Sequence, residues 1–295
     1  MDPRRLKAMK NALEALEVRY REPRALDLDP LSIPLGYSDP WDREVTAWVA
    51  AHLAYGRVAP MLKAIRGALA PLGPSPSQWL RMKDAAQART VLTRALEGWV
   101  WRFHTTQDMV EWLLAWKQLD GETRNRGLEA YLLPAAGLSA EETLSALVQR
   151  LRRELPANYG IRFSLPDPRE GSACKRWRMF LRWMVREGWP DLGQWRAYPR
   201  ESLVIPLDPH VARTARLIGL SQRRAPDGRM AQEITDFLRL IDPSDPLRFD
   251  FALSHLGIMG DCPGVRTLPT CAPCPLVALC GSGVTKRKTK PPPLP

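Results

Sequence analysis

The chain has 295 residues, enough for one large or two medium domains, and its 45% hydrophobic content excludes global disorder. Lys and Arg number 43 against 32 Asp and Glu, so the formal net charge is +11. A polyanion such as nucleic acid is the expected partner, and a basic protein without such a partner is the alternative. The sequence contains no run of ~18 apolar residues, the length that a membrane-spanning helix needs. We therefore expect no membrane partner.

The N-terminal sequence lacks the apolar core of a signal peptide. We therefore expect a cytoplasmic protein. Because thiols stay reduced in that compartment, clustered cysteines indicate metal binding rather than disulfides.

Helical periodicity with short Pro-rich breaks recurs along the chain, and strand signals are almost absent. The segment 158–171 is predicted to be an irregular connection, and the basic, Pro-rich tail 286–295 to be disordered. The predicted helices span 4–20, 42–55, 58–70, 84–97, 106–119, 139–155, 172–187, 209–219, 229–241 and 246–258.

The predicted helix 172–187 has two opposite faces. Ser172 is expected to cap it. At 100° per residue, its apolar side chains fall on one face, which we expect to be core. The opposite face carries four cations without an intervening acid: it is either a solvated surface or a contact for the DNA phosphate backbone. Its members are Lys175, Arg178, Arg182 and Arg186.

Asp208 precedes Pro209 at the start of an apolar-periodic run. The local pattern is typical of an N-cap aspartate followed by proline at the first helical position. A carboxylate held at a helix start is rigid and can also face a cleft, so a cap does not exclude a catalytic role.

Four of the five cysteines lie within 19 residues, with the spacing C-x8-C-x2-C-x5-C. Four thiolates this close can converge on one centre, either an iron–sulfur cluster or a tetrahedral zinc ion. Four buried free cysteines are the remaining alternative. Cys174, far away in sequence, is expected in the core or at a helix start. The cluster residues are Cys262, Cys271, Cys274 and Cys280.

These features resemble the endonuclease III class of helix-hairpin-helix DNA glycosylases. That class ends in a [4Fe–4S] loop spaced C-x6-C-x2-C-x5-C, and the last two spacings agree here. A Val-Asp-Thr-His-Val segment precedes the loop in that class, and LDPHVARTARLIGL, with Asp208 and His210, stands in its place. The whole chain also resembles a bacterial family of unknown function that is distantly related to those glycosylases.

The resemblance implies catalytic roles for two residues. Asp208 would stabilise positive charge developing at the sugar C1′. Lys175, 33 residues upstream and the only lysine between Lys117 and Lys286, would be the amine nucleophile of a bifunctional enzyme. The usual Leu-Pro-Gly-Val-Gly hairpin before that lysine is missing, and a solvated cation is the alternative for Lys175. The longer gap to Asp208 is closer to the archaeal 8-oxoguanine glycosylases.

Further residues are candidates for DNA contacts. The segment AHLAYGRV stands where the family has a short segment lining the lesion site, so Tyr55 and Arg57 could stack on or probe a flipped base. For Tyr55 the alternative is a residue that closes a buried helix. Arg266, inside the cysteine loop, is a further candidate for a DNA contact.

We therefore predict an all-α fold of two helical domains with an interdomain cleft. A helical barrel would span 41–200, with a hairpin-like region near 158–187, and 1–40 plus 201–295 would form the cluster-bearing domain. The predicted activity is excision of a damaged or mispaired base that is flipped out of double-stranded DNA. If Lys175 is the nucleophile, the enzyme also nicks the strand. We expect the protein to act as a monomer. The alternative is a non-catalytic iron–sulfur protein that binds DNA.

Overall fold

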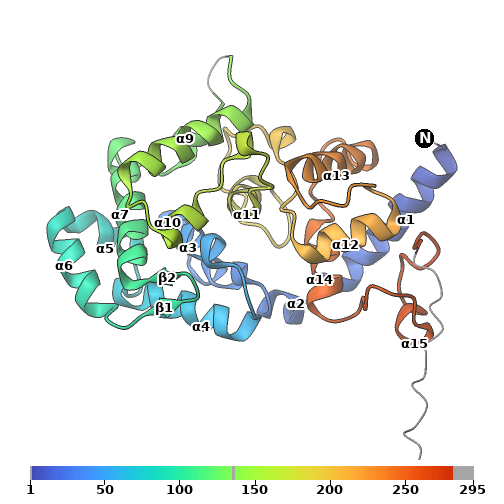
Figure 1. The fold of residues 1–295 in the computed structure, drawn as a ribbon, viewed down its shortest axis with the longest axis horizontal. Coiled ribbons are helices and arrows are strands. Elements are labelled where there is room, and N and C mark those ends of the chain that lie inside the picture. Colours follow the sequence, from blue (N-terminus) through green and yellow to red (C-terminus); the bar gives the residue numbers. More distant parts are fainter. Residues whose placement is uncertain (1, 135–136, 282–295) are drawn as a thin grey trace, which may run out of the picture.

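The computed structural model describes residues 2–134 and 137–281, so the predicted disordered tail 286–295 lies outside the described residues. The described chain is predominantly helical, as predicted (Figure 1). Its α-helices are α1 (Pro3–Tyr20), α2 (Pro23–Asp27), α3 (Pro40–Leu53), α4 (Val58–Leu69), α5 (Pro76–Met82), α6 (Ala85–Ala95), α7 (Thr106–Glu122), α8 (Glu129–Leu132), α9 (Ala140–Glu154), α10 (Tyr159–Ser164), α11 (Lys175–Val185), α12 (Pro209–Ile218), α13 (Gly228–Ile241), α14 (Asp250–Ile258) and α15 (Leu268–Cys271).

Short 3-10 turns and one small hairpin complete the described elements. The turns are η1 (Pro30–Ser32), η2 (Pro34–Gly36), η3 (Ala70–Leu72), η4 (Pro168–Glu170) and η5 (Arg200–Ser202). Strands β1 (Val100–Trp101) and β2 (His104–Thr105) pair antiparallel around a two-residue turn. The segment 158–171, predicted to be irregular, instead contains α10, which Asn158 caps by accepting a hydrogen bond from the Ile161 amide at 2.9 Å.

The buried apolar side chains form two clusters. The first draws mainly on α3 to α11, with four fully buried tryptophans at its heart. The second combines α1 with α12, α13 and α14. Leu31 and Ile33 of the early segment pack into the first cluster. Figure 1 shows α11 in the middle of the molecule, between the elements of the two clusters.

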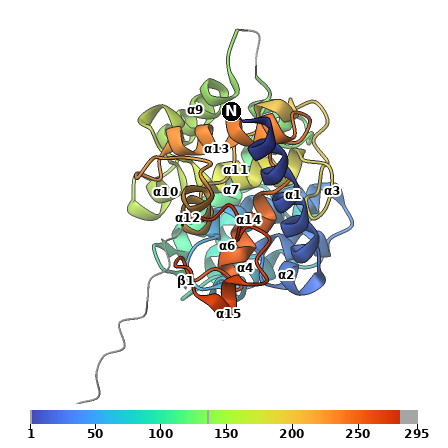
Figure 2. The same ribbon diagram turned by 90° about the vertical axis from the view of Figure 1, so that its right-hand side faces the viewer.

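Helix α1 lies against elements from the other end of the chain, as Figures 1 and 2 show. Its apolar face packs into the second cluster, and its end is held by polar contacts. The Tyr20 hydroxyl donates a hydrogen bond to Asp261 at 2.6 Å, and Arg248 donates one to Glu17 at 2.7 Å. In the part of the chain that is described, no helix has both the length and the apolar character needed to cross a bilayer.

Candidate functional site

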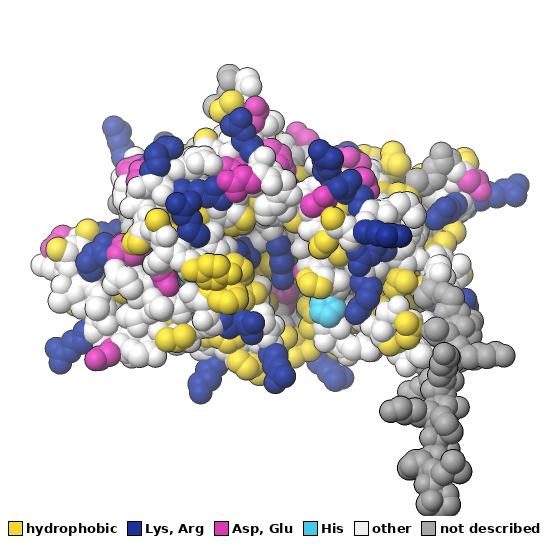
Figure 3. Space-filling view, viewed as in Figure 1, with side chains coloured by type: hydrophobic (Ala, Val, Ile, Leu, Met, Phe, Trp, Pro, Cys, Tyr) yellow, Lys and Arg dark blue, Asp and Glu magenta, His cyan; other side chains and the backbone are white. Residues whose placement is uncertain are grey.

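A cleft with a volume of about 550 Å³ lies between elements of the two clusters. Its walls come from the loop after α3, from α11, from the start of α12 and from α14. In the space-filling view, hydrophobic side chains gather near the middle of this face, with Lys and Arg side chains around them (Figure 3). Six residues that the sequence analysis singled out line this one cleft: Tyr55, Arg57, Lys175, Arg182, Asp208 and His210.

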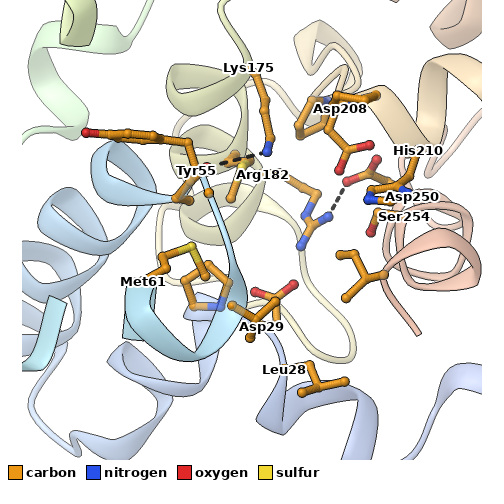
Figure 4. A pocket seen from close by; sticks show the side chains of 18 of the residues that line it. Leu28, Asp29, Tyr55, Met61, Lys175, Arg182, Asp208, His210, Asp250 and Ser254 are labelled. Atoms are coloured by element: carbon orange, nitrogen blue, oxygen red, sulfur yellow. Dashed lines mark hydrogen bonds and ion pairs between the residues drawn. The ribbon is translucent and has the colours of Figure 1, made fainter. Parts of the chain in front are cut away.

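Asp208 is the N-cap of α12, as the local pattern predicts. One carboxylate oxygen accepts a hydrogen bond from the Val211 amide at 2.8 Å, and Pro209 occupies the first turn. The side chain is buried, yet it lines the cleft and is directed toward it (Figure 4). The cap therefore fixes a carboxylate at the cleft wall.

Lys175 is the first residue of α11 and projects into the same cleft (Figure 4). Its amine donates a hydrogen bond to the carbonyl of Ala54 at 3.5 Å. The helix begins three residues later than predicted, because Cys174 enters it in the left-handed region at φ 46°. Ser172 does not cap it; the Ser172 hydroxyl instead accepts a hydrogen bond from the Cys174 amide at 3.2 Å.

Helix α11 does not present its three arginines as the basic surface that the sequence predicted. The apolar face is core, as expected, but Arg178, Arg182 and Arg186 are each about 4% exposed, so they do not form a solvated basic surface; of the three, Arg182 lines the cleft. Acidic side chains from the loop after α11 and from more distant segments pair with them. Arg182 pairs with Asp191 and Asp250, Arg186 pairs with Asp191 and Asp245, and Arg178 pairs with Glu141.

Asp250 is a cleft residue that the sequence analysis missed. It is 2% exposed at the start of α14, and Arg182 donates a hydrogen bond to one of its carboxylate oxygens. Burial raises the pKa of Asp250 to about 7, although Arg182 opposes this, and the neighbouring Asp208 raises it further. Its other carboxylate oxygen has no hydrogen-bond partner among the described residues. An acid inside the apolar run FDFALSHL was the available signal.

His210 also lines the cleft, next to Asp208 on α12. Its ring lies directly on the backbone of α14 at Gly257, where a Cβ atom would come within 2.2 Å of the His210 ring. Any larger residue at 257 would displace the histidine. The glycine therefore sets how closely α12 and α14 approach each other below the cleft.

Tyr55 and Arg57 line the cleft in different ways. The Tyr55 hydroxyl is engaged inside the protein, donating a hydrogen bond to the Trp101 carbonyl at 3.1 Å and lying 2.6 Å from His104 Nδ1. Burial raises the pKa of Tyr55 to about 12. Arg57 is exposed at the N-terminus of α4, so its guanidinium is available to a ligand in the cleft.

The four clustered cysteines line one small pocket, of about 30 Å³, away from the cleft. Arg266 lines this pocket too, so the structure places it with the cysteines. The Thr267 amide donates a hydrogen bond to Cys271 Sγ at 3.4 Å. Among residues 2–134 and 137–281, no three His, Cys, Asp or Glu side chains converge as a single metal ion requires. Cys174 is apart from this group, buried at the start of α11.

Fold and cleft together define a predominantly helical protein in which a lysine and an aspartate share one cleft. Residues 29–259 match the family described as "Protein of unknown function (DUF2400)", and the chain belongs to that family. No curated protein and no solved structure matches the chain.

Proposed function

We propose that this protein is a DNA base-excision glycosylase that acts on a damaged or mispaired base flipped into the cleft. The observation that supports the proposal most is the meeting of Lys175 and Asp208, 33 residues apart, in one cleft. An amine nucleophile and a fixed carboxylate in one cleft are what this kind of cleavage at a sugar C1′ requires. The two hydrophobic clusters are consistent with two domains flanking that cleft.

In the proposed reaction, the bond between C1′ and the base nitrogen breaks, and its electron pair leaves with the base, which takes up a proton. The Asp208 carboxylate stabilises the positive charge that develops at C1′. The Lys175 amine attacks C1′, forms a new C–N bond and loses a proton, giving a Schiff base once the sugar ring opens. A nick in the strand follows from that intermediate.

The residues that we propose to contact DNA are basic side chains that are accessible at the protein surface. The net charge of +11 favours a polyanion, and Arg57 at the cleft is exposed. Arg266, half-buried beside the cysteines, is a second candidate. The α11 arginines are not among them, because their charges are paired inside the protein.

We further propose that Cys262, Cys271, Cys274 and Cys280 hold a [4Fe–4S] cluster. The four cysteines share one pocket, and the Thr267 amide donates a hydrogen bond to the sulfur of Cys271. A single zinc ion would hold its sulfurs within about 4 Å of one another, whereas a cluster gives each cysteine its own iron and spaces them more widely. When bound, such a cluster would anchor this loop.

Borohydride trapping on DNA tests the proposed chemistry. With duplexes carrying an abasic site or a lesion, the wild-type protein should become covalently attached to DNA in the presence of borohydride, because the Schiff base is reduced to a stable amine. Lys175→Gln should not be trapped. If Lys175→Gln is trapped like the wild type, another residue is the nucleophile.

A non-catalytic DNA-binding protein is the second candidate, and one observation favours it. The chain enters α11 through η4 and the left-handed Cys174, without the glycine-rich hairpin that the glycosylases place there. In that case, lesion-bearing duplexes would be bound, but neither base release nor trapping would occur with any of them.

A further inference from the structure

An aromatic platform lies beside the cleft, formed by Phe103, Tyr159 and Phe163. Among the described residues, the exposed large hydrophobic side chains include only two aromatic ones, Phe103 at 40% and Tyr159 at 66% exposure. These two rings touch, with centroids 5.2 Å apart, and Phe163 lies 4.9 Å from Phe103. Exposed rings that gather in one place indicate a binding surface rather than incomplete burial.

The platform is held rigidly by its two supporting elements. Phe103 stands in the two-residue turn of the β1–β2 hairpin, after Arg102 at φ 51°. Such turns usually contain glycine or asparagine, so an arginine here carries backbone strain in order to present its side chain. Gly160 of α10 brings Tyr159 close, because a Cβ atom at 160 would lie 2.6 Å from the Phe103 carbonyl oxygen.

The charge around the platform is positive. The exposed Arg102 guanidinium lies 5.7 Å from the centre of the Phe103 ring. The Arg176 guanidinium lies beneath the platform, 3.9 Å from the centre of the Phe163 ring, but it is buried and donates to the Phe163 carbonyl, so it supports the rings rather than facing a ligand. Arg162 is exposed on the same short helix as Tyr159. The nearby Asp108 is 2% exposed and its carboxylate accepts hydrogen bonds that cap α7 and hold Asn158, so the exposed charges beside the rings include those of Arg102 and Arg162.

The platform continues into the cleft through Tyr55. The Tyr55 ring lies parallel to that of Phe103, at 6.0 Å and 11°, and 5.0 Å from Phe163. A second hollow of about 560 Å³, which contains Phe163 and Arg162, shares Ala54, Tyr55 and Lys175 with the cleft. A strand that enters the cleft can therefore extend over the rings without leaving the protein surface.

We propose that this platform binds the unpaired bases of a single-stranded stretch of DNA. Flat rings stack on any base, and arginines beside them bind the phosphates, which is how proteins hold single strands without reading their sequence. The inference extends the proposed function, because it identifies unpaired nucleotides next to the cleft as part of the substrate. The inference concerns binding alone and requires no cleavage of DNA. Its test can therefore fail or succeed independently of the proposed base excision.

Fluorescence anisotropy with two labelled single strands tests the proposal. One is a thymidine 12-mer, and the other is a 12-mer of tetrahydrofuran abasic units with the same phosphates. The wild-type protein should bind the thymidine strand more tightly. In the double variant Phe103→Ala, Tyr159→Ala, its affinity should fall at least about fivefold for each ring lost, to near that for the abasic strand.

The controls separate stacking from charge and from folding. Tyr159→Phe keeps the ring and should keep the preference for bases, and Leu240→Ala removes an exposed side chain of α13 and should leave both affinities unchanged. Equal wild-type affinity for the two strands would overturn the proposal, because phosphates alone would then account for binding. An unchanged thymidine affinity in the double variant would overturn it as well.

Discussion

The side chain of Asp208 caps helix α12 and at the same time lines the cleft. Lys175 faces the same space from the first turn of α11. Both side chains are therefore held by backbone that helix formation has already fixed, rather than by flexible loops. This arrangement allows each residue's structural role to be separated from its proposed chemical role by a suitable substitution.

Asp208→Asn should leave the melting temperature nearly unchanged, because the amide oxygen can still accept from the Val211 amide. Asp208→Ala should cost about 1 kcal/mol of stability through loss of the cap. On a lesion substrate, both variants should lose activity by roughly 10²–10³-fold, because both lack the charge that stabilises the sugar cation. Full base release by Asp208→Asn would leave Asp208 as a helix cap only.

His104, under the aromatic platform, should make stability depend on pH. Burial lowers the pKa of His104 to about 4, and the nearby Arg176 adds to this. The unfolded chain takes up the proton near pH 6.5, so the unfolded state binds more protons between pH 6.5 and 4. The stabilisation is complete above pH 6.5 and is lost as the pH falls through this window.

Chemical denaturation at pH 7 and pH 4.5 measures this effect. His104→Gln should keep polar contacts to the Tyr55 and Ser164 hydroxyls, which lie 2.6 and 2.7 Å from the ring nitrogens. Between pH 7 and pH 4.5, the free energy of unfolding should fall in both proteins. The fall should be smaller in His104→Gln than in the wild type, by about 2–3 kcal/mol. The same drop in both proteins would show that His104 is protonated in the folded state.

At the scale of the helix, α11 shows what a sequence pattern can and cannot predict. The burial of its apolar face follows from periodicity alone. The role of the opposite face does not, because Asp191, Asp245 and Asp250 reach its arginines from segments that a helical projection cannot place. The same limit applies to the β1–β2 hairpin, whose turn lacks the usual glycine or asparagine.

The long helices were predictable because they are either apolar along one face, as α9 is, or apolar nearly all round, as α3 is, and several begin at a recognisable cap, such as Ser139 for α9. Short α10 was not, since one and a half turns carry too little periodicity. Within the site, the cap role of Asp208 followed from its own neighbours. That Lys175 lies across from it could be expected only from the family resemblance, because no local pattern relates two residues so far apart.

Arg182→Leu should destabilise the protein by about 3–5 kcal/mol, because it leaves the buried carboxylate of Asp250 without its cation and leaves Asp191 with Arg186 alone. Arg57→Ala, at an exposed position, should leave stability within about 0.5 kcal/mol. Arg57→Ala should instead reduce the salt dependence of DNA binding by about one phosphate contact. Thermal unfolding measures the loss of stability, and DNA affinity measured against salt concentration measures the phosphate contact. If Arg182→Leu is as stable as the wild type and shows the weaker salt dependence, Arg182 contacts DNA and does not stabilise the fold.

At the scale of the whole molecule, helices α12 and α14 contribute side chains to both the cleft and the cysteine pocket. The Arg213 side chain of α12 donates a hydrogen bond to the Cys262 carbonyl at 3.0 Å, and the Gly281 amide donates one to the Leu217 carbonyl at 2.7 Å. The cysteine loop is thus fastened to the same helix that begins with Asp208. If the cysteine loop unfolds, we expect the packing of the second hydrophobic cluster to loosen before that of the first.

Protein purified without oxygen should contain about four irons per chain. Cys271→Ser should lose the iron and lower the melting temperature, because ligation is coupled to folding of the loop. Cys174→Ser is the matched control: its sulfur is buried at the start of α11, outside the cysteine pocket, so iron content should be kept. Zinc at one ion per chain, with no iron, would contradict the cluster assignment.

The packing of α1 against α13 and α14 has a consequence for synthesis on the ribosome. Met9, Leu13 and Leu16 have their partners more than two hundred residues downstream. At ordinary elongation rates, this helix waits roughly 10–50 s before α14 is made. During that interval its apolar face is open to chaperones or to other nascent chains, while the first cluster can already assemble. The newly made protein is therefore most exposed to misassembly at its amino-terminal helix.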